Sequence, residues 1–224
     1  FKASEGEKIG IIGPTGSGKS SLISLIPRLY DTTSGSVMIG NKDVRSLKIK
    51  DLRKIIGVVL QDTTLFSGSI ADNLRFGMED ANEEMMDSAT RDAQAFEFIN
   101  SSNEGYNREV GQRGKNLSGG QKQRISIART LIKNPKILIL DDSSSALDME
   151  TESKLQNSLK NRMKDSTVFL IAQRISAVMD SDKIIVLDNG EIAAIGTHKE
   201  LIKNCEIYRS IAISQLGEEA VLNV

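Results

Sequence analysis

The sequence is short of several features that would each point to a class of protein. It has one cysteine, Cys205, in 224 residues, so no disulfide can form within the chain, and this usage is typical of a reducing compartment. Its longest apolar runs fall far short of the roughly 18–20 residues that cross a bilayer. No signal-peptide pattern is visible at its N-terminus. Any membrane role is therefore expected to come through a partner or through sequence outside this chain.

An excess of one charge is also missing. The 29 Lys and Arg residues nearly balance the 30 Asp and Glu residues, for a net charge of −1. A nucleic-acid-binding domain usually carries a basic excess, so no nucleic-acid partner is expected. The only histidine, His198, lies at an expected helix start and is interpreted as a surface residue rather than a ligand or base.

Strand and helix patterns alternate along the chain, which predicts an α/β fold with a largely parallel sheet. A helix is expected from about Gly18 to Pro27–Leu29. The expected strands are Lys8–Ile12, Ser36–Ile39, Ile56–Leu60, Ile137–Asp141, Thr167–Ile171 and Lys183–Leu187.

The stretch at about 62–134 has a different texture, with almost no β-rich run and several helical patterns, such as Glu83–Ala93 and Gln121–Lys133. Along the latter, one apolar stripe of helical spacing is formed by Ile125, Ala128, Leu131 and Ile132. We therefore expect a single domain, 1–224, with a core at about 1–61 and 135–224 and an inserted α-helical subdomain at about 62–134.

A phosphate-binding motif follows the first expected strand. Residues 13–20 match G-x-x-x-x-G-K-S, between a strand and a helix, as that motif requires. The glycines let backbone N–H groups curl around phosphates, and the helix N-terminus adds the positive end of a dipole. A glycine-rich turn with an accidental Lys-Ser pair is the alternative, but it does not account for the flanking strand and helix. The residues expected to hold the phosphates of ATP are Gly13, Pro14, Thr15, Gly16, Ser17, Gly18, Lys19, Ser20 and Ser21.

A carboxylate stands where such a site would need one. Asp141 ends a buried apolar strand, which is where nucleotide sites open in parallel sheets. With Ser20, it is expected to ligate Mg²⁺. The alternative is a helix N-cap, since Asp141 to Ser144 are all good capping residues. Pairing with the phosphate loop favours the metal-binding role.

A third motif reads Leu117, Ser118, Gly119, Gly120, Gln121. It places a hydroxyl and exposed backbone amides at a helix N-terminus, which is a second device for binding anions. One chain with two phosphate-binding elements, about a hundred residues apart, suggests that one of them contacts a nucleotide held by another chain.

Together these motifs resemble the nucleotide-binding domain of ATP-binding cassette (ABC) transporters, with a P-loop NTPase (RecA-like) core. Thr64–Ile70 and Glu109–Gly114 resemble the exporter branch. The resemblance covers nearly the whole chain and rests, in order, on the Gly13 loop, Gln61, the Leu117–Gln121 motif, Asp141 and Ser145–Asp148.

The resemblance implies a head-to-tail dimer. Each ATP would lie between the phosphate loop of one chain and the Leu117–Gln121 motif of the other. Gln61 would contact Mg²⁺ and the γ-phosphate, and the segment after it would contact a transmembrane domain absent from this chain. That domain would hold the protein at the cytoplasmic face of the cell membrane.

Two positions depart from the family pattern. A catalytic Glu is usual where this chain has Asp142, and a His that contacts the γ-phosphate is usual where it has Gln173. Asp is one methylene shorter than Glu, and Gln cannot carry a positive charge. Both changes weaken the positioning and charge stabilisation on which phosphoryl transfer depends. Drift or engineering would explain either change, but the pair resembles the degenerate half of a heterodimeric exporter.

Three functions therefore stay open. The first is an exporter half whose own site, with Asp142, Gln173 and Gln61 in the catalytic positions, hydrolyses ATP weakly. In this case the Leu117–Gln121 motif, called the signature motif below, completes the site of a different partner chain. The second is a homodimer that hydrolyses ATP with Asp142, and the third is an ABC ATPase that never meets a membrane. The family also stacks adenine on an aromatic well upstream of the loop. Only twelve residues precede Gly13, so we expect the N-terminal β region to be truncated.

Overall fold

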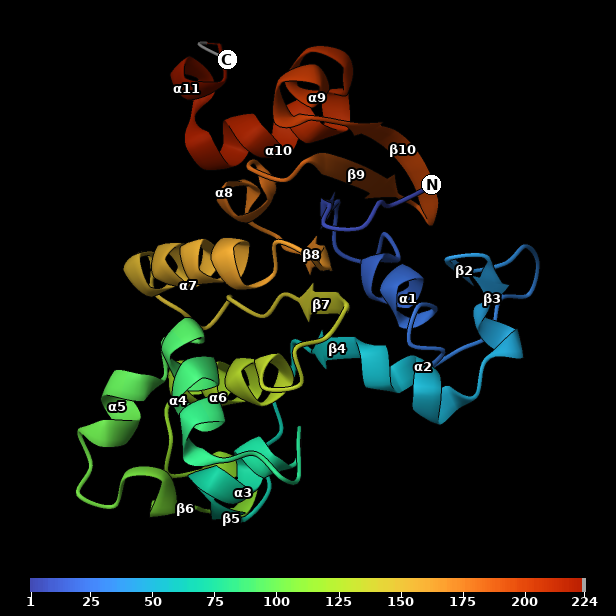
Figure 1. Ribbon diagram of the computed structural model, residues 1–224. Helices are drawn as coiled ribbons and strands as arrows, with labels where there is room; N and C mark the ends of the chain where they lie inside the picture. Colours follow the sequence, from blue (N-terminus) through green and yellow to red (C-terminus); the bar gives the residue numbers. More distant parts are fainter. Residues whose placement is uncertain (223–224) are drawn as a thin grey trace. The chain divides into compact units, whose positions relative to one another are not determined.

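The computed structural model describes residues 1–222, so the last two residues of the expected 1–224 domain lie outside it. The chain forms two compact units, which Figure 1 shows in sequence colours. The first consists of Phe1–Ile56, Ile137–Asp142 and Ser166–Val224, and the second of Gly57–Lys136 and Ser143–Asp165. The division into a core and an inserted subdomain stays a prediction.

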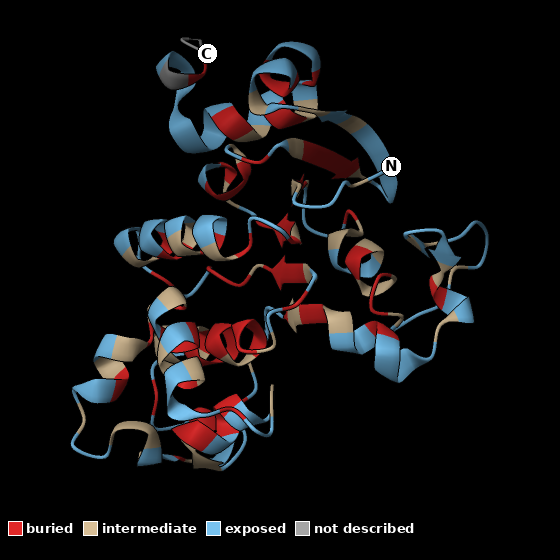
Figure 2. Ribbon diagram, viewed as in Figure 1, coloured by how far each residue is buried: buried red, intermediate tan, exposed pale blue. Residues whose placement is uncertain are grey.

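The first unit is built on five sheet strands in the order β10-β9-β1-β8-β7. Strand β1 pairs in parallel with β8 and β9, and β7 pairs in parallel with β8, while only β10 runs antiparallel to its neighbour. The parallel strands are nearly continuous apolar runs and are buried, as expected for a sheet covered on both faces (Figure 2). The strands are β1 (Lys8–Ile12), β7 (Ile137–Asp141), β8 (Thr167–Ile171), β9 (Lys183–Asp188) and β10 (Glu191–Gly196). The predicted α/β class and largely parallel sheet are confirmed.

Helices cover this sheet, with α1 packed against β8 and α8 against both β1 and β8. A small hairpin, β2 (Met38–Ile39) and β3 (Lys42–Asp43), leads through a 3₁₀ turn, η1 (Val44–Ser46), to α2. The helices of this unit are α1 (Lys19–Ser24), α2 (Ile49–Ile55), α8 (Ile175–Val178), α9 (His198–Asn204), α10 (Glu206–Leu216) and α11 (Glu218–Leu222).

Helix α1 ends at Ser24, one turn earlier than the sequence pattern predicted. Pro27 explains the difference. It has no N–H to donate to the carbonyl of Ile23, and its ring would clash with that carbonyl in a continued helix. The chain instead forms turns, and Arg28 adopts a positive φ of 53°.

The second unit is mainly helical. Strand β4 (Ile56–Val59) starts at the unit boundary and leads into α3 (Ile70–Arg75), α4 (Glu83–Asp92), α5 (Phe96–Asn100), α6 (Gly119–Leu131) and α7 (Met149–Arg162). Short elements join them: β5 (Gly68–Ser69), η2 (Gly105–Asn107), β6 (Glu109–Val110) and η3 (Gln112–Gly114). The stripe predicted from Ile125 to Ile132 is confirmed as core, since none of its four residues is more than 4% exposed.

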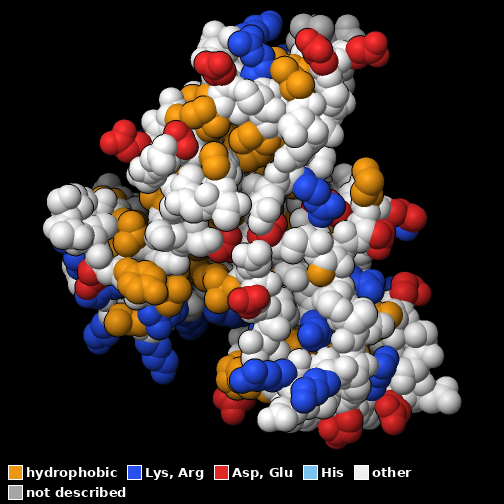
Figure 3. All heavy atoms as spheres, turned by 180° about the vertical axis from the view of Figure 1, so that it is seen from behind, with side chains coloured by type: hydrophobic (Ala, Val, Ile, Leu, Met, Phe, Trp, Pro, Cys, Tyr) orange, Lys and Arg blue, Asp and Glu red, His pale blue; other side chains and the backbone are white. Residues whose placement is uncertain are grey.

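The described part of the chain has no helix that is both long enough and apolar enough to cross a bilayer. On the face drawn in Figure 3, side chains of Lys and Arg and side chains of Asp and Glu both reach the surface.

Candidate functional site

The predicted phosphate loop joins β1 to α1 in the first unit. Lys19 is the first residue of α1, and its ammonium group donates hydrogen bonds of 2.9 Å each to the carbonyls of Gly13 and Pro14. The loop is closed by a bond of 3.2 Å from the Ser17 N–H to Pro14 O. The side chain of Lys19 thus lies along the loop, and the exposed residues Thr15 and Gly16 form the tip.

The turn between β9 and β10 supports this loop from behind, a contact that was not predicted from the sequence. A Cβ atom built on Gly13 would lie 2.0 Å from Leu187 O, so only glycine allows the two backbones to come this close. The Gly190 N–H also donates to Ser17 O, at 3.2 Å. Asn189 and Gly190 have φ values of 46° and 81°, as a two-residue hairpin turn requires. An Asn-Gly pair between two strands is the sequence signal that locates it.

Asp141 lies at the end of β7, where a metal carboxylate was predicted. It is 8% exposed and hydrogen-bonded to Ser20. Burial raises the pKa of Asp141, as does the nearby Asp142 carboxylate, while Ser20 and Lys19 oppose the shift. Burial likewise lowers the pKa of Lys19, against the pull of the two carboxylates. The phosphate loop, the Lys19 ammonium and the Asp141 carboxylate therefore lie together in one partly desolvated site.

A hydroxyl and a carboxylate are the hard oxygen ligands that Mg²⁺ prefers, so Ser20 and Asp141 fit that ion. Among residues 1–222 there is no cluster of three or more His, Cys, Asp or Glu side chains that could hold a metal by itself. The site thus suits a metal that arrives with phosphate oxygens rather than one held entirely by protein.

The two unusual residues lie together in the same unit. Asp142 follows β7 with a φ of 47°, and its N–H donates to Ile171 O at 2.9 Å. Gln173 follows β8 and donates from Nε2 to Asp142 Oδ2, at 3.0 Å. The chain therefore holds the Asp142 carboxylate with a neutral amide.

The Leu117–Gln121 motif belongs to the second unit, at the start of α6. Ser118 is its N-cap, and a capping box is complete: Ser118 Oγ accepts from the Gln121 N–H, and Gln121 Oε1 accepts from the Ser118 N–H. A hydroxyl that accepts one bond still has a proton to donate. Ser118 and Gly119 are exposed, so this end of α6 is open to solvent.

Gly120 packs on the segment that precedes α7. A Cβ atom on Gly120 would lie 3.0 Å from Ala146 O, tighter than nearly all real contacts of this kind. The segment itself is fixed by Asp148, the N-cap of α7, and by a hydrogen bond from the Ser144 hydroxyl to buried Glu152. The predicted motifs at Leu117 and Ser145 thus form one surface of the second unit.

Gln61 is an exposed residue of the second unit, beyond the end of β4. After it, the segment toward α3 is anchored by buried Asn73, whose amide bonds both backbone groups of Phe66 and the carbonyl of Ser69. The proposed metal and γ-phosphate contacts of Gln61 stay predictions.

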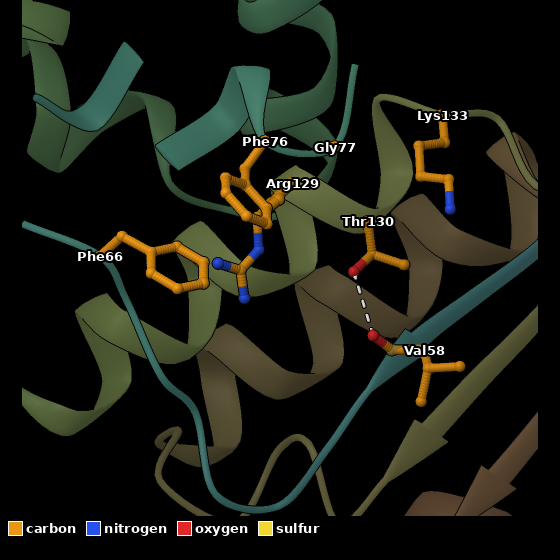
Figure 4. Close-up of a pocket in the computed structure, with 7 residues that line it drawn as sticks. All are labelled: Val58, Phe66, Phe76, Gly77, Arg129, Thr130 and Lys133. Atoms are coloured by element: carbon orange, nitrogen blue, oxygen red, sulfur yellow. Dashed lines mark hydrogen bonds between the residues drawn. The ribbon is translucent and has the colours of Figure 1, made fainter. Parts of the chain in front are cut away.

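Beside this segment the second unit has a pocket of about 290 Å³. The rings of Phe66 and Phe76 stack at 4.3 Å, and the Arg129 guanidinium lies 5.8 Å from the centre of the Phe66 ring (Figure 4). Burial lowers the pKa of Arg129 and of Lys133, as expected for cations beside apolar walls. The lining residues are Val58, Phe66, Phe76, Gly77, Arg129, Thr130 and Lys133.

His198 differs from its expectation as a plain surface residue. It is half-buried, and its Nδ1 lies 2.7 Å from the hydroxyl of fully buried Tyr208. Burial lowers the pKa of His198. The pair joins the start of α9 to α10 and lies among structural rather than phosphate-binding residues.

These elements match a known family. A family model described as "ABC transporter" matches residues 1–145, which carry the phosphate loop, the Leu117–Gln121 motif and Asp141. The chain belongs to the ABC transporter family. ATP-binding domains of this family bind and hydrolyse ATP.

The similar proteins include bacterial proteins named as putative multidrug export proteins. The chain is 50% identical over 202 residues to "Putative multidrug export ATP-binding/permease protein YgaD" of Bacillus subtilis (strain 168), covering 90% of this chain and 35% of that protein. It is 42% identical over 215 residues to "ATP-binding cassette sub-family B member 5" of Mus musculus, covering 96% of this chain and 17% of that protein.

Among solved structures, "Structure of a bacterial Atm1-family ABC exporter with ATP bound" matches with a TM-score of 0.92 and 38% identity. The match covers 96% of this chain and 37% of that one. The P-loop fold of an exporter-type ABC ATP-binding domain is thus confirmed. The chain spans about a third of the length of the bacterial relatives.

Proposed function

We propose that this chain is the ATP-binding domain of one half of a heterodimeric ABC exporter. The site at its own phosphate loop would hold Mg-ATP and hydrolyse it slowly. The observation that carries the proposal is the 3.0 Å hydrogen bond between Gln173 and Asp142. In this bond the neutral amide of Gln173 donates to the Asp142 carboxylate, which is the group that would have to orient the attacking water.

Binding and hydrolysis make different demands on this site. Binding needs the loop amides, Lys19 and a metal held by Ser20 and Asp141, with Gln61 as a further proposed ligand. When bound, Mg²⁺ would neutralise charge on the outer phosphates. Hydrolysis also needs a well-placed base, and a misplaced one commonly costs roughly 10²–10⁴-fold in rate. Asp142 is one methylene too short. Gln173 would contact the γ-phosphate through a hydrogen bond, but it cannot offset the developing negative charge.

The signature motif would serve the other chain of a head-to-tail dimer. The exposure of Ser118 and Gly119 at the N-terminus of α6 supports a contact to a phosphate that this chain does not hold. This chain combines an intact signature motif with a weakened hydrolytic site. That asymmetry is expected of a dimer of two different chains. ATP-driven closure of the two chains would then power export.

Coupling to the membrane would run through the pocket beside Phe66 and Phe76. Both rings are exposed, at 45% and 70%, and they adjoin the exporter-like segment Thr64–Ile70. An apolar pocket with cations at its edge fits a short amphipathic helix reaching down from a transmembrane domain. The transmembrane domain would hold this chain at the cytoplasmic face of the membrane.

The test is to restore the usual pair of residues in the full assembly. With the partner's site silenced, Asp142→Glu combined with Gln173→His is expected to raise ATP turnover by at least roughly 10-fold. Asp165→Glu, the same one-methylene change at an exposed position, is the matched control and should change nothing. No rise in the double variant would refute the degenerate-site proposal. Robust ATPase activity of the full-length wild-type protein alone would favour a homodimer instead.

A further inference from the structure

The segment that carries Gln173 is held by a side chain from helix α10. Gln215 Nε2 donates a 2.8 Å hydrogen bond to Gln173 O, and Gln215 Oε1 accepts a 2.8 Å bond from the Ile175 N–H. One amide side chain therefore bonds an acceptor and a donor on either side of Arg174. These bonds join residues about forty positions apart within the first unit.

The bond to Ile175 meets a need of α8. The first N–H groups of a helix have no intrahelical acceptor, and the N-cap of α8, Arg174, makes no side-chain capping bond. Ile175 is fully buried, where an unsatisfied N–H is costly. Gln215 supplies the cap from another element.

Helix periodicity explains why Gln215 is in place. Tyr208, Ala212 and Gln215 are spaced i, i+4 and i+7, so they share one face of α10. The first two are fully buried and α10 packs against α8, which turns Gln215 toward the Gln173 segment. The same segment then reaches Asp142 through the Gln173 side chain.

We propose that Gln215 is a positioning residue for the ATP site: it fixes the backbone of Gln173 so that the Gln173 amide faces the terminal phosphate and Asp142. This rests on the proposed function, in which Gln173 contacts the γ-phosphate. Because ADP has no γ-phosphate, loss of Gln215 weakens ATP binding and leaves ADP binding unchanged. A merely structural role would weaken both alike.

The experiment uses the full-length protein assembled with its partner, in which the partner's phosphate-loop lysine is replaced. Dissociation constants of Mg-ATP and Mg-ADP are measured for Gln215→Leu, which keeps the size and removes both polar atoms. The Kd for ATP is expected to rise about 5-fold, the effect of losing one ordinary hydrogen bond, here the one from the Gln173 amide to the γ-phosphate. The Kd for ADP should stay within about 2-fold of its wild-type value. Ser214→Ala, its exposed neighbour on α10, should change neither.

Two further variants keep the result decisive. Gln215→Glu retains the oxygen that caps Ile175 and replaces the donor to Gln173 by a charged carboxylate oxygen that repels the Gln173 carbonyl. It should therefore show an ATP-specific loss even where Gln215→Leu folds poorly. In a Gln173→Ala background, Gln215→Leu should have no further effect on the ratio of ATP to ADP affinity.

The outcomes separate the two proposals. If Gln173→Ala lowers the ATP preference but Gln215→Leu and Gln215→Glu do not, or if they weaken ATP and ADP equally, the positioning role of Gln215 is overturned. If Gln173→Ala itself leaves the preference unchanged, the γ-phosphate contact of Gln173 in the proposed function is overturned.

Discussion

The substitution Gly13→Ala tests whether the turn after β9 sets the shape of the phosphate loop. The added methyl carbon would lie 2.0 Å from Leu187 O and 2.9 Å from Ser17 Oγ, whereas ordinary contacts begin at 3.4 Å. Leu187 is 3% exposed and paired with β10, so its carbonyl is not free to turn aside. Either β9 or the loop must shift.

The expected cost has two parts. Overpacking a well-packed site costs about 1–3 kcal/mol. The Gly13 backbone angle, φ 156°, adds strain of about 1–3 kcal/mol once a Cβ is present. A combined loss of about 2–6 kcal/mol, at about 3 °C per kcal/mol for a domain of this size, lowers the thermal midpoint by about 6–18 °C.

Gly16→Ala is the matched control in the same loop. Gly16 also has a positive φ, 84°, but no other group lies within 4 Å of the position that its Cβ would take. Only backbone strain of about 1–2 kcal/mol applies, which lowers the midpoint by about 3–6 °C.

The assay is thermal unfolding of the nucleotide-free domain, followed by circular dichroism for the wild type and both variants. Equal decreases for Gly13→Ala and Gly16→Ala would refute the reasoning, because the close approach to Leu187 would then carry no weight. A decrease under about 3 °C for Gly13→Ala would have the same meaning.

Three further predictions concern charge and the signature motif. Burial raises the pKa of Asp141, so Asp141→Asn is expected to raise the thermal midpoint of the nucleotide-free protein at pH 7. This gain should disappear below about pH 4, where the Asp141 carboxyl is protonated in both the folded and the unfolded protein. The same variant should abolish thermal stabilisation by Mg-ATP. Burial lowers the pKa of His198, so folding stability falls as the pH drops through about 6.5; urea unfolding at two pH values should show a smaller fall in His198→Asn. Gly120→Ala, whose Cβ would meet Ala146 O at 3.0 Å, is expected to reduce turnover at the partner's site and to leave Mg-ATP binding at this chain's own site unchanged, as measured by binding with the partner's site silenced.

The sequence predicts best where the signal is local. Strands β1, β7 and β8 have the expected bounds because each is a short, mainly apolar run. Helix α6 shows its buried stripe for the same reason. The end of α1 was misplaced because apolar spacing continued past Pro27, where backbone chemistry outweighs side-chain pattern.

Contacts between distant segments leave no such signal. The Gln215 bonds and the His198–Tyr208 pair each depend on how α10 packs within the first unit. Their residues are ordinary helix residues in the sequence, and no motif marks them. The support of the phosphate loop by the Asn189–Gly190 turn is an intermediate case. The Asn-Gly pair predicts the turn, but nothing in the sequence predicts that the turn contacts the phosphate loop.

The site also explains why Asp142 and Gln173 have to be exchanged together. The phosphate loop and the proposed metal ligands are held independently of this pair, since Lys19 bonds the loop carbonyls and Ser20 bonds Asp141. Asp142 and Gln173 instead bond each other. Changing either one alone alters the geometry of that bond as well as the chemistry, so a single variant mixes two effects. Only Asp142→Glu combined with Gln173→His replaces one coupled pair by another, and only that comparison isolates the hydrolytic step.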